Sequence, residues 1–340
     1  MYNLLEQKRY IDNNFRFLNK TLFYQKKDES HLYWEEQGVE KKVFIGGRTM
    51  DIVFNTGARE ILVILDSGKG LLFTEELQQK PLNEELNYYS RKDIDDYVIL
   101  TKGMLFDKIY GVFSLSRHEI LFETKELVGL DIFEDKIYRE SDGVVTCRHI
   151  ETGEIQWQFP LSPYGEYFQN GEYHAMDVQK FLGVYESVFY LIAGNRLILG
   201  IDVATGKEVY KFEYTEKVGG LKNTELDIDS GTIFSLGPNH YVEINLETPE
   251  CKVFDISESV AKYGLEGERL GSWEKNLIYF WEGSRNNRFG IFDRNLSEII
   301  WSEEIPEVKD HFPAIINVKH GGDKLYVHDI NLTLHIFEKE

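Results

Sequence analysis

The 340-residue sequence has little cysteine, methionine or proline, and it is short of positive charge. It contains two Cys, four Met and seven Pro, and its 38 Lys and Arg face 58 Asp and Glu, giving a formal net charge of −20 at pH 7. Nucleic acids and anionic membrane surfaces are both bound by clustered Lys and Arg. We therefore expect neither a nucleic acid nor a membrane as partner, and a basic protein suits the charge better.

Long apolar segments are also missing. The sequence contains no run of 18 apolar residues, the length that would span a bilayer. Residues 1–10 lack the apolar core of a signal peptide. Cys147 and Cys251 stand far apart without the CxxC spacing of metal or redox sites, which is typical of small buried apolar residues. These absences predict a cytoplasmic protein, and a secreted protein that has been trimmed is the alternative.

Motifs that carry chemistry are absent as well. The nine His are scattered and form no HExxH, and no GxSxG or phosphate-binding loop occurs. With 58 carboxylates in the chain, adjacent acidic pairs say nothing about acid/base catalysis. We assign no catalytic, cofactor-binding or metal-binding residue.

The sequence is rich in aromatic residues, at 14%, and in short antiparallel units. The clearest unit runs from Ser187 to Phe212. Two apolar strands, 188–193 and 196–202, flank a Gly-Asn turn, and an Ala-Thr-Gly turn leads to a third strand. Gly and Asn tolerate the positive φ that tight hairpin turns need, so this stretch predicts a β-meander.

This unit recurs along the chain. Residues equivalent to Leu197 have a mean spacing of about 43, the period of a four-stranded propeller blade. They are Leu32, Leu71, Ile109, Val144, Leu197, Tyr241, Phe289 and Leu332. In six of the first seven units an aromatic residue follows 12 or 13 positions later, where an outer strand is expected, and in the other it follows after 17. These aromatic residues are Phe44, Tyr88, Phe122, Trp157, Tyr210, Phe254 and Trp301.

The repeats predict an all-β protein, a single β-propeller domain over residues 1–340 with eight four-stranded blades. Seven blades with an N-terminal extension is the alternative. The second unit should place its outer strand at 85–89, after Pro81, and the third should begin with an inner strand at 96–101. The last unit ends at its third strand, so residues 2–8 either supply the missing outer strand or form a short helix.

Two stretches resemble a known repeat. Residues 202–210 (DVATGKEVY) and 150–157 (IETGEIQW) are similar to the D-x-x-T-G-K-x-x-W repeat of pyrroloquinoline-quinone-like, or quinoprotein-type, propellers. Residues 324–329 and 332–337 resemble the hairpin of that family. The resemblance implies a propeller fold and either a quinone enzyme or a protein-interaction scaffold. The adjacent cysteines typical of the quinone-using enzymes are absent, so it implies no cofactor here.

Departures from the repeat indicate where a partner binds. Residues 160–177 lengthen one connection between blades by about ten residues beyond the mean spacing, and they mix aromatic residues with Gly and Asn, as recognition loops do. The alternative is that these aromatic residues cover the edge of their own blade. A hairpin tip at 282–288 supplies one Arg of interest, with a solvated turn as its alternative. The predicted partner-binding residues are Tyr164, Tyr167, Phe168, Tyr173, His174 and Arg285.

We therefore expect a non-catalytic propeller that binds a protein partner. A specific version is an acidic intracellular inhibitor of a basic protein, of the immunity type that neutralises a toxin. The alternative is a propeller that binds a carbohydrate or another small ligand, or an enzyme acting at the mouth of the axial channel with residues from several inner strands.

Overall fold

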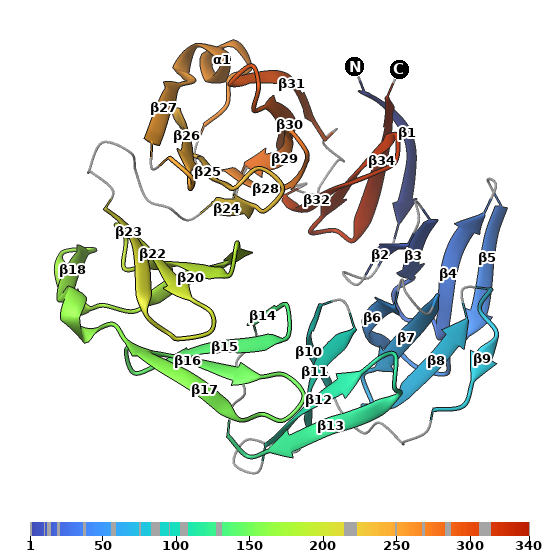
Figure 1. Ribbon diagram of the computed structural model, residues 1–340. Helices are drawn as coiled ribbons and strands as arrows, with labels where there is room; N and C mark the ends of the chain where they lie inside the picture. Colours follow the sequence, from blue (N-terminus) through green and yellow to red (C-terminus); the bar gives the residue numbers. More distant parts are fainter. Residues whose placement is uncertain are drawn as a thin grey trace.

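The computed structural model shows eight four-stranded antiparallel sheets arranged as blades around a central axis (Figure 1). It describes residues 2–9, 11, 15–18, 21–36, 39–55, 59–74, 76–82, 89–94, 96–102, 108–126, 131–213, 223–248, 250–266, 269–282, 287–305 and 314–339. The predicted eight-bladed, all-β propeller is confirmed, and the seven-bladed alternative is wrong.

Each blade runs from an inner strand beside the axis to an outer strand at the rim. Blades 1 to 4 consist of β2 (Arg16–Leu18), β3 (Thr21–Gln25), β4 (His31–Glu36) and β5 (Val39–Phe44); β6 (Thr49–Asn55), β7 (Glu60–Leu65), β8 (Gly70–Thr74) and β9 (Gln79–Lys80); β10 (Tyr89–Ile94), β11 (Tyr97–Lys102), β12 (Ile109–Ser114) and β13 (Glu119–Thr124); β14 (Asp131–Phe133), β15 (Lys136–Ser141), β16 (Val144–His149) and β17 (Ile155–Pro160).

The second half of the ring repeats this order. Blades 5 to 7 consist of β20 (Val178–Tyr185), β21 (Val188–Ala193), β22 (Leu197–Asp202) and β23 (Glu208–Glu213); β24 (Thr224–Asp227), β25 (Thr232–Leu236), β26 (His240–Asn245) and β27 (Glu250–Asp255); β28 (Arg269–Glu274), β29 (Leu277–Glu282), β30 (Arg288–Asp293) and β31 (Glu298–Glu304).

Blade 8 joins the two ends of the chain. Its inner three strands are β32 (Ile315–Gly321), β33 (Lys324–Asp329) and β34 (Thr333–Lys339), and its outer strand is β1 (Tyr2–Arg9), antiparallel to β34. The two termini therefore lie side by side (Figure 1). Residues 2–8 form a strand and not the alternative helix, and they cover an edge that would otherwise be unpaired.

The core lies between blades and not within any one of them. Among the described residues, eight buried clusters each join two neighbouring blades, and one of them joins blade 8 to blade 1. Second strands are therefore covered on both faces, and all six residues of β7 are buried. This double burial explains why the second strands read as continuous apolar runs and not as alternating patterns.

Two strand assignments from the sequence are wrong. The outer strand of blade 2 is β9, ahead of Pro81, while Tyr88 and most of the expected strand at 85–89 lie outside the described residues. The run at 96–101, expected to be the inner strand of blade 3, instead lies in its second strand, β11, and β10 is the inner strand. The apolar run at 97–102 suits a second strand, because that position is covered on both faces.

Connections from one blade's outer strand to the next blade's inner strand lie on one face of the ring, which we call the top face. The connection between blades 4 and 5 contains η1 (Ser162–Tyr164), β18 (Glu166–Gln169) and β19 (Glu172–Ala175). The connection between blades 6 and 7 contains α1 (Ser257–Lys262). Among the described residues, no helix is long and apolar enough to cross a membrane.

Candidate functional site

The long connection between blades 4 and 5 folds into a small antiparallel hairpin, β18–β19, separate from the blades. Asn170 and Gly171 form its turn, with φ of 53° and 89°. Positive φ at both central positions is the geometry of a type I′ turn, for which Asn-Gly is the preferred pair. The composition of residues 160–177 predicts a recognition loop, whereas the Asn-Gly pair between two short runs is the local signal for this hairpin.

The hairpin is fixed to the top of blade 5 by the β21–β22 turn. Gly194 has a φ of 56°, and a Cβ built on it would lie 2.8 Å from Sδ of Met176 and 3.0 Å from Cδ1 of Tyr167. The amide of Gly194 donates to the carbonyl of Asp177 at 2.8 Å. The amide side chain of Asn195 donates to the carbonyl of Phe168 at 2.9 Å. The close approach at Gly194 lets the hairpin lie directly on the blade.

Two of the predicted binding residues serve this attachment. Tyr167 is 4% exposed and belongs to the core cluster between blades 4 and 5, together with Met176. Its hydroxyl accepts a hydrogen bond from Nε2 of Gln179 at 3.1 Å. Tyr164 is half-buried, and its hydroxyl donates to the carboxylate of Glu208 on the outer strand of blade 5. These two rings therefore pack against blade 5.

Three other predicted residues are exposed. Phe168 and Tyr173 face each other across the two strands, and they are 54% and 73% exposed. Their ring centroids are 5.2 Å apart in an edge-to-face arrangement. His174 is exposed and lies opposite Tyr167, with ring centroids 5.6 Å apart. Arg285, the sixth predicted residue, lies outside the described residues. Because directly paired residues share a face, Phe168 and Tyr173 lie on one face of the hairpin and His174 lies on the other, with Tyr167. We call Phe168 and Tyr173 the hairpin surface.

The hairpin strands carry acidic but no Lys or Arg side chains. Glu166 and Glu172 are exposed, on β18 and β19. The ammonium of Lys211, on the outer strand of blade 5, lies 5.4 Å from the centre of the Tyr164 ring. The hairpin surface is thus an aromatic pair flanked by carboxylates.

The pKa values of Tyr167 and Cys147 are shifted because both side chains are buried. Burial, together with a hydrogen bond to Asp177, raises the pKa of Tyr167, so its phenol stays protonated. Burial raises the pKa of the Cys147 thiol to about 12, which makes this cysteine a poor nucleophile at neutral pH. Among the described residues, no three His, Cys, Asp or Glu side chains gather as metal ligands.

Solved structures share this fold at low sequence identity. BamB from Moraxella catarrhalis superposes with a TM-score of 0.60 and 11% identity over 100% of both chains. The C-terminal WD40 domain of Sif2 gives 0.63 and 10%, covering 100% of this chain and 99% of that one. Sqt1 of Saccharomyces cerevisiae gives 0.63 and 11%, covering 99% of each chain. No protein-family model and no curated protein matches the sequence. The chain is a β-propeller.

Proposed function

We propose that this propeller binds a protein partner through the hairpin surface. The main observation is the exposed pair Phe168 and Tyr173, which lies on one face of a hairpin whose other face packs Tyr167 into the core between blades 4 and 5. Aromatic residues presented on a rigid element give a large contact area with little loss of conformational freedom on binding. They are also enriched in the centres of protein interfaces.

The charge of the chain supports a basic partner. The net charge is −20, and Glu166 and Glu172 flank the aromatic pair. Complementary charges speed encounter and suppress unsuitable partners. Inhibition of a basic protein, as by an immunity-type protein acting on a toxin, is the specific form of this proposal. We also propose a cytoplasmic location, supported by the free thiols of Cys147 and Cys251.

We further propose that the blades belong to the pyrroloquinoline-quinone-like repeat class and that this protein binds no quinone. The support is that the Thr-Gly turns at 152–153 and 205–206 each contact an outer-strand aromatic residue of the preceding blade. A Cβ on Gly153 would lie 2.7 Å from the Phe122 ring, and one on Gly206 would lie 2.6 Å from the Trp157 ring.

The test replaces both exposed rings, Phe168→Ala with Tyr173→Ala, and captures partners from native lysate for mass spectrometry. Phe44→Ala is the matched control, since this exposed aromatic residue (67%) lies on an outer strand of blade 1. We expect a basic protein to be retained by the wild type and the control and lost by the double variant. Equal retention by all three would contradict the hairpin as the binding surface.

The salt dependence tests the charge of the partner. Retention should fall as salt rises from about 50 mM to about 500 mM, because screening shortens the reach of the acidic surface. An acidic partner, or retention that does not change with salt, would contradict the basic partner while leaving the hairpin assignment intact.

A further inference from the structure

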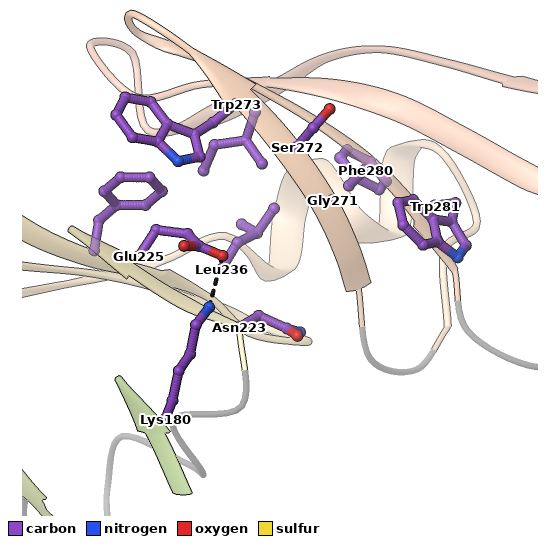
Figure 2. A pocket seen from close by; sticks show the side chains of 11 residues that line it. Lys180, Asn223, Glu225, Leu236, Gly271, Ser272, Trp273, Phe280 and Trp281 are labelled. Atoms are coloured by element: carbon purple, nitrogen blue, oxygen red, sulfur yellow. Dashed lines mark hydrogen bonds and ion pairs between the residues drawn. The ribbon is translucent and has the colours of Figure 1, made fainter. Parts of the chain in front are cut away.

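A second candidate site lies between blades 6 and 7 and next to the inner strand of blade 5. It is a cavity of about 250 Å³ (Figure 2). The inner strands β20, β24 and β28 contribute to its wall, as do the second strands β25 and β29. The lining used below comprises Lys180, Glu225, Phe234, Leu236, Trp273 and Trp281.

One wall of the cavity carries an ion pair. Nζ of Lys180 donates to Oε1 of Glu225 at 2.7 Å, and the two side chains are 32% and 37% exposed. Within the described part of the chain, Oε2 of Glu225 receives no hydrogen bond, and the Lys180 ammonium has protons to spare after this one contact. The pair therefore offers an acceptor and a donor side by side with no net charge.

The rest of the lining is mostly apolar, with Asn223 and Ser272 as its other polar side chains. Phe234 and Leu236 are each 2% exposed. Trp273 meets Phe234 edge to face, with ring centroids 5.3 Å apart, and Trp281 lies farther along the same blade (Figure 2). A ligand in the cavity would thus contact aromatic and aliphatic carbon on several sides and a donor–acceptor pair on another.

We propose that this cavity binds one ring of a neutral sugar. A pyranose has an apolar face of C–H groups and a rim of hydroxyls, so the apolar walls suit its face and the Lys180–Glu225 pair suits two neighbouring hydroxyls. The volume lies below the range of about 300–1,000 Å³ typical of drug-sized ligands, which fits a single ring. A charged ligand would have to compete with one member of the existing ion pair and would leave the other member unpaired.

Titration of the purified protein with D-glucose, D-galactose and D-mannose, followed by calorimetry and tryptophan fluorescence, tests the assignment. D-Glucuronate and D-glucosamine are the charged comparisons. Glu225→Gln and Lys180→Met each remove one member of the pair. The matched control is Glu123→Gln, because Glu123 pairs with Lys102 at 2.6 Å with similar exposures of 42% and 34%, in blade 3. Circular dichroism and thermal melting establish that each variant is folded.

We expect saturable binding of at least one neutral sugar, weakened at least ~10-fold by Glu225→Gln or Lys180→Met and unchanged by Glu123→Gln. The Phe168→Ala/Tyr173→Ala variant should bind the sugar normally, which separates this site from the hairpin surface. The proposal fails if no neutral sugar saturates the protein below about 10 mM. It fails equally if a charged sugar binds more tightly, or if folded Glu225→Gln and Lys180→Met bind like the wild type.

Discussion

The indole N–H of Trp157, on the outer strand of blade 4, donates a hydrogen bond of 2.7 Å to the carbonyl of Val203 in blade 5. Both residues are buried. The ring lies over the Ala-Thr-Gly turn that follows Val203, which Asp202 holds by accepting from the amide and hydroxyl of Thr205 at 2.7 Å and 2.6 Å. One tryptophan thus ties the outer edge of a blade to the tight turn of the next.

Trp157→Phe should lower the free energy of unfolding by about 1–3 kcal/mol, because the buried Val203 carbonyl loses its donor. Urea unfolding followed by circular dichroism measures the loss. Trp301→Phe is the control, since that outer-strand indole N–H makes no hydrogen bond within the described residues and should cost less. Equal losses would show that ring size, and not the hydrogen bond, stabilises the blade contact.

Gly206→Ala should lower the free energy of unfolding by more than the positive φ at this position alone would explain. Gly206 has a φ of 68°, and an added Cβ would lie 2.6 Å from Cγ of Trp157. Gly143→Ala is the matched control, with a φ of 71° but an ordinary contact of 3.5 Å to the Met176 carbonyl. We expect a loss of ~1–2 kcal/mol for the control and a further ~1–3 kcal/mol for Gly206→Ala, measured by urea unfolding. Similar losses for both variants would contradict the close packing under Trp157.

Asp227→Asn should destabilise the protein by about 1–3 kcal/mol at neutral pH, because the buried Arg294 loses the closer of its two carboxylate partners and keeps only Glu243, at 3.6 Å. Arg294 donates to Asp227 at 2.7 Å, and their side chains are 6% and 9% exposed. Glu250→Gln is the surface control, since its pair with Lys252 is 63% and 57% exposed and should contribute little. An equally small effect of both substitutions would contradict a structural role for the buried pair.

The Asp227–Arg294 pair also predicts that the free energy of unfolding depends on pH. Burial opposes ionisation of Asp227, but hydrogen bonds from Arg294 and Ser230 and the charge of Arg294 outweigh it, so its pKa lies below the ordinary value. Its contribution to stability is therefore complete above the unfolded pKa of about 3.9 and is lost as the pH falls through the lower folded value. Unfolding free energies at several pH values from about 6 down to about 3 should fall less steeply for Asp227→Asn than for the wild type. Parallel curves would contradict this contribution.

The number of blades could be predicted because each repeat is marked by turn residues and apolar residues that act over a few neighbouring positions. Leu197, Tyr241 and Phe289 all lie in the third strand of their blades, as the spacing indicated. The Thr-Gly turns were readable for the same reason, since positive φ at Gly153 and Gly206 is a local requirement. The position of each strand within blade 3 could not be predicted from the sequence. An apolar run such as 97–102 is compatible with any strand that is buried on both faces.

The composition of the hairpin connection indicated an unusual segment but not the roles within it. Tyr167 and Phe168 are adjacent aromatic residues, yet one is 4% and the other 54% exposed. Successive side chains on a strand point to opposite faces, and the contact with Gly194 decides which face is buried. The pairing that fixes this alternation is between β18 and β19.

Local chemistry alone determined that the chain forms eight similar antiparallel units, because turn residues and apolar spacing act over a few neighbouring positions. Only the tertiary structure decided which aromatic residues of the hairpin reach solvent, how β1 completes blade 8, and that Lys180, Glu225 and Trp273 line one cavity. The physical reason is that these outcomes depend on which surfaces of distant segments meet when the blades pack around their axis.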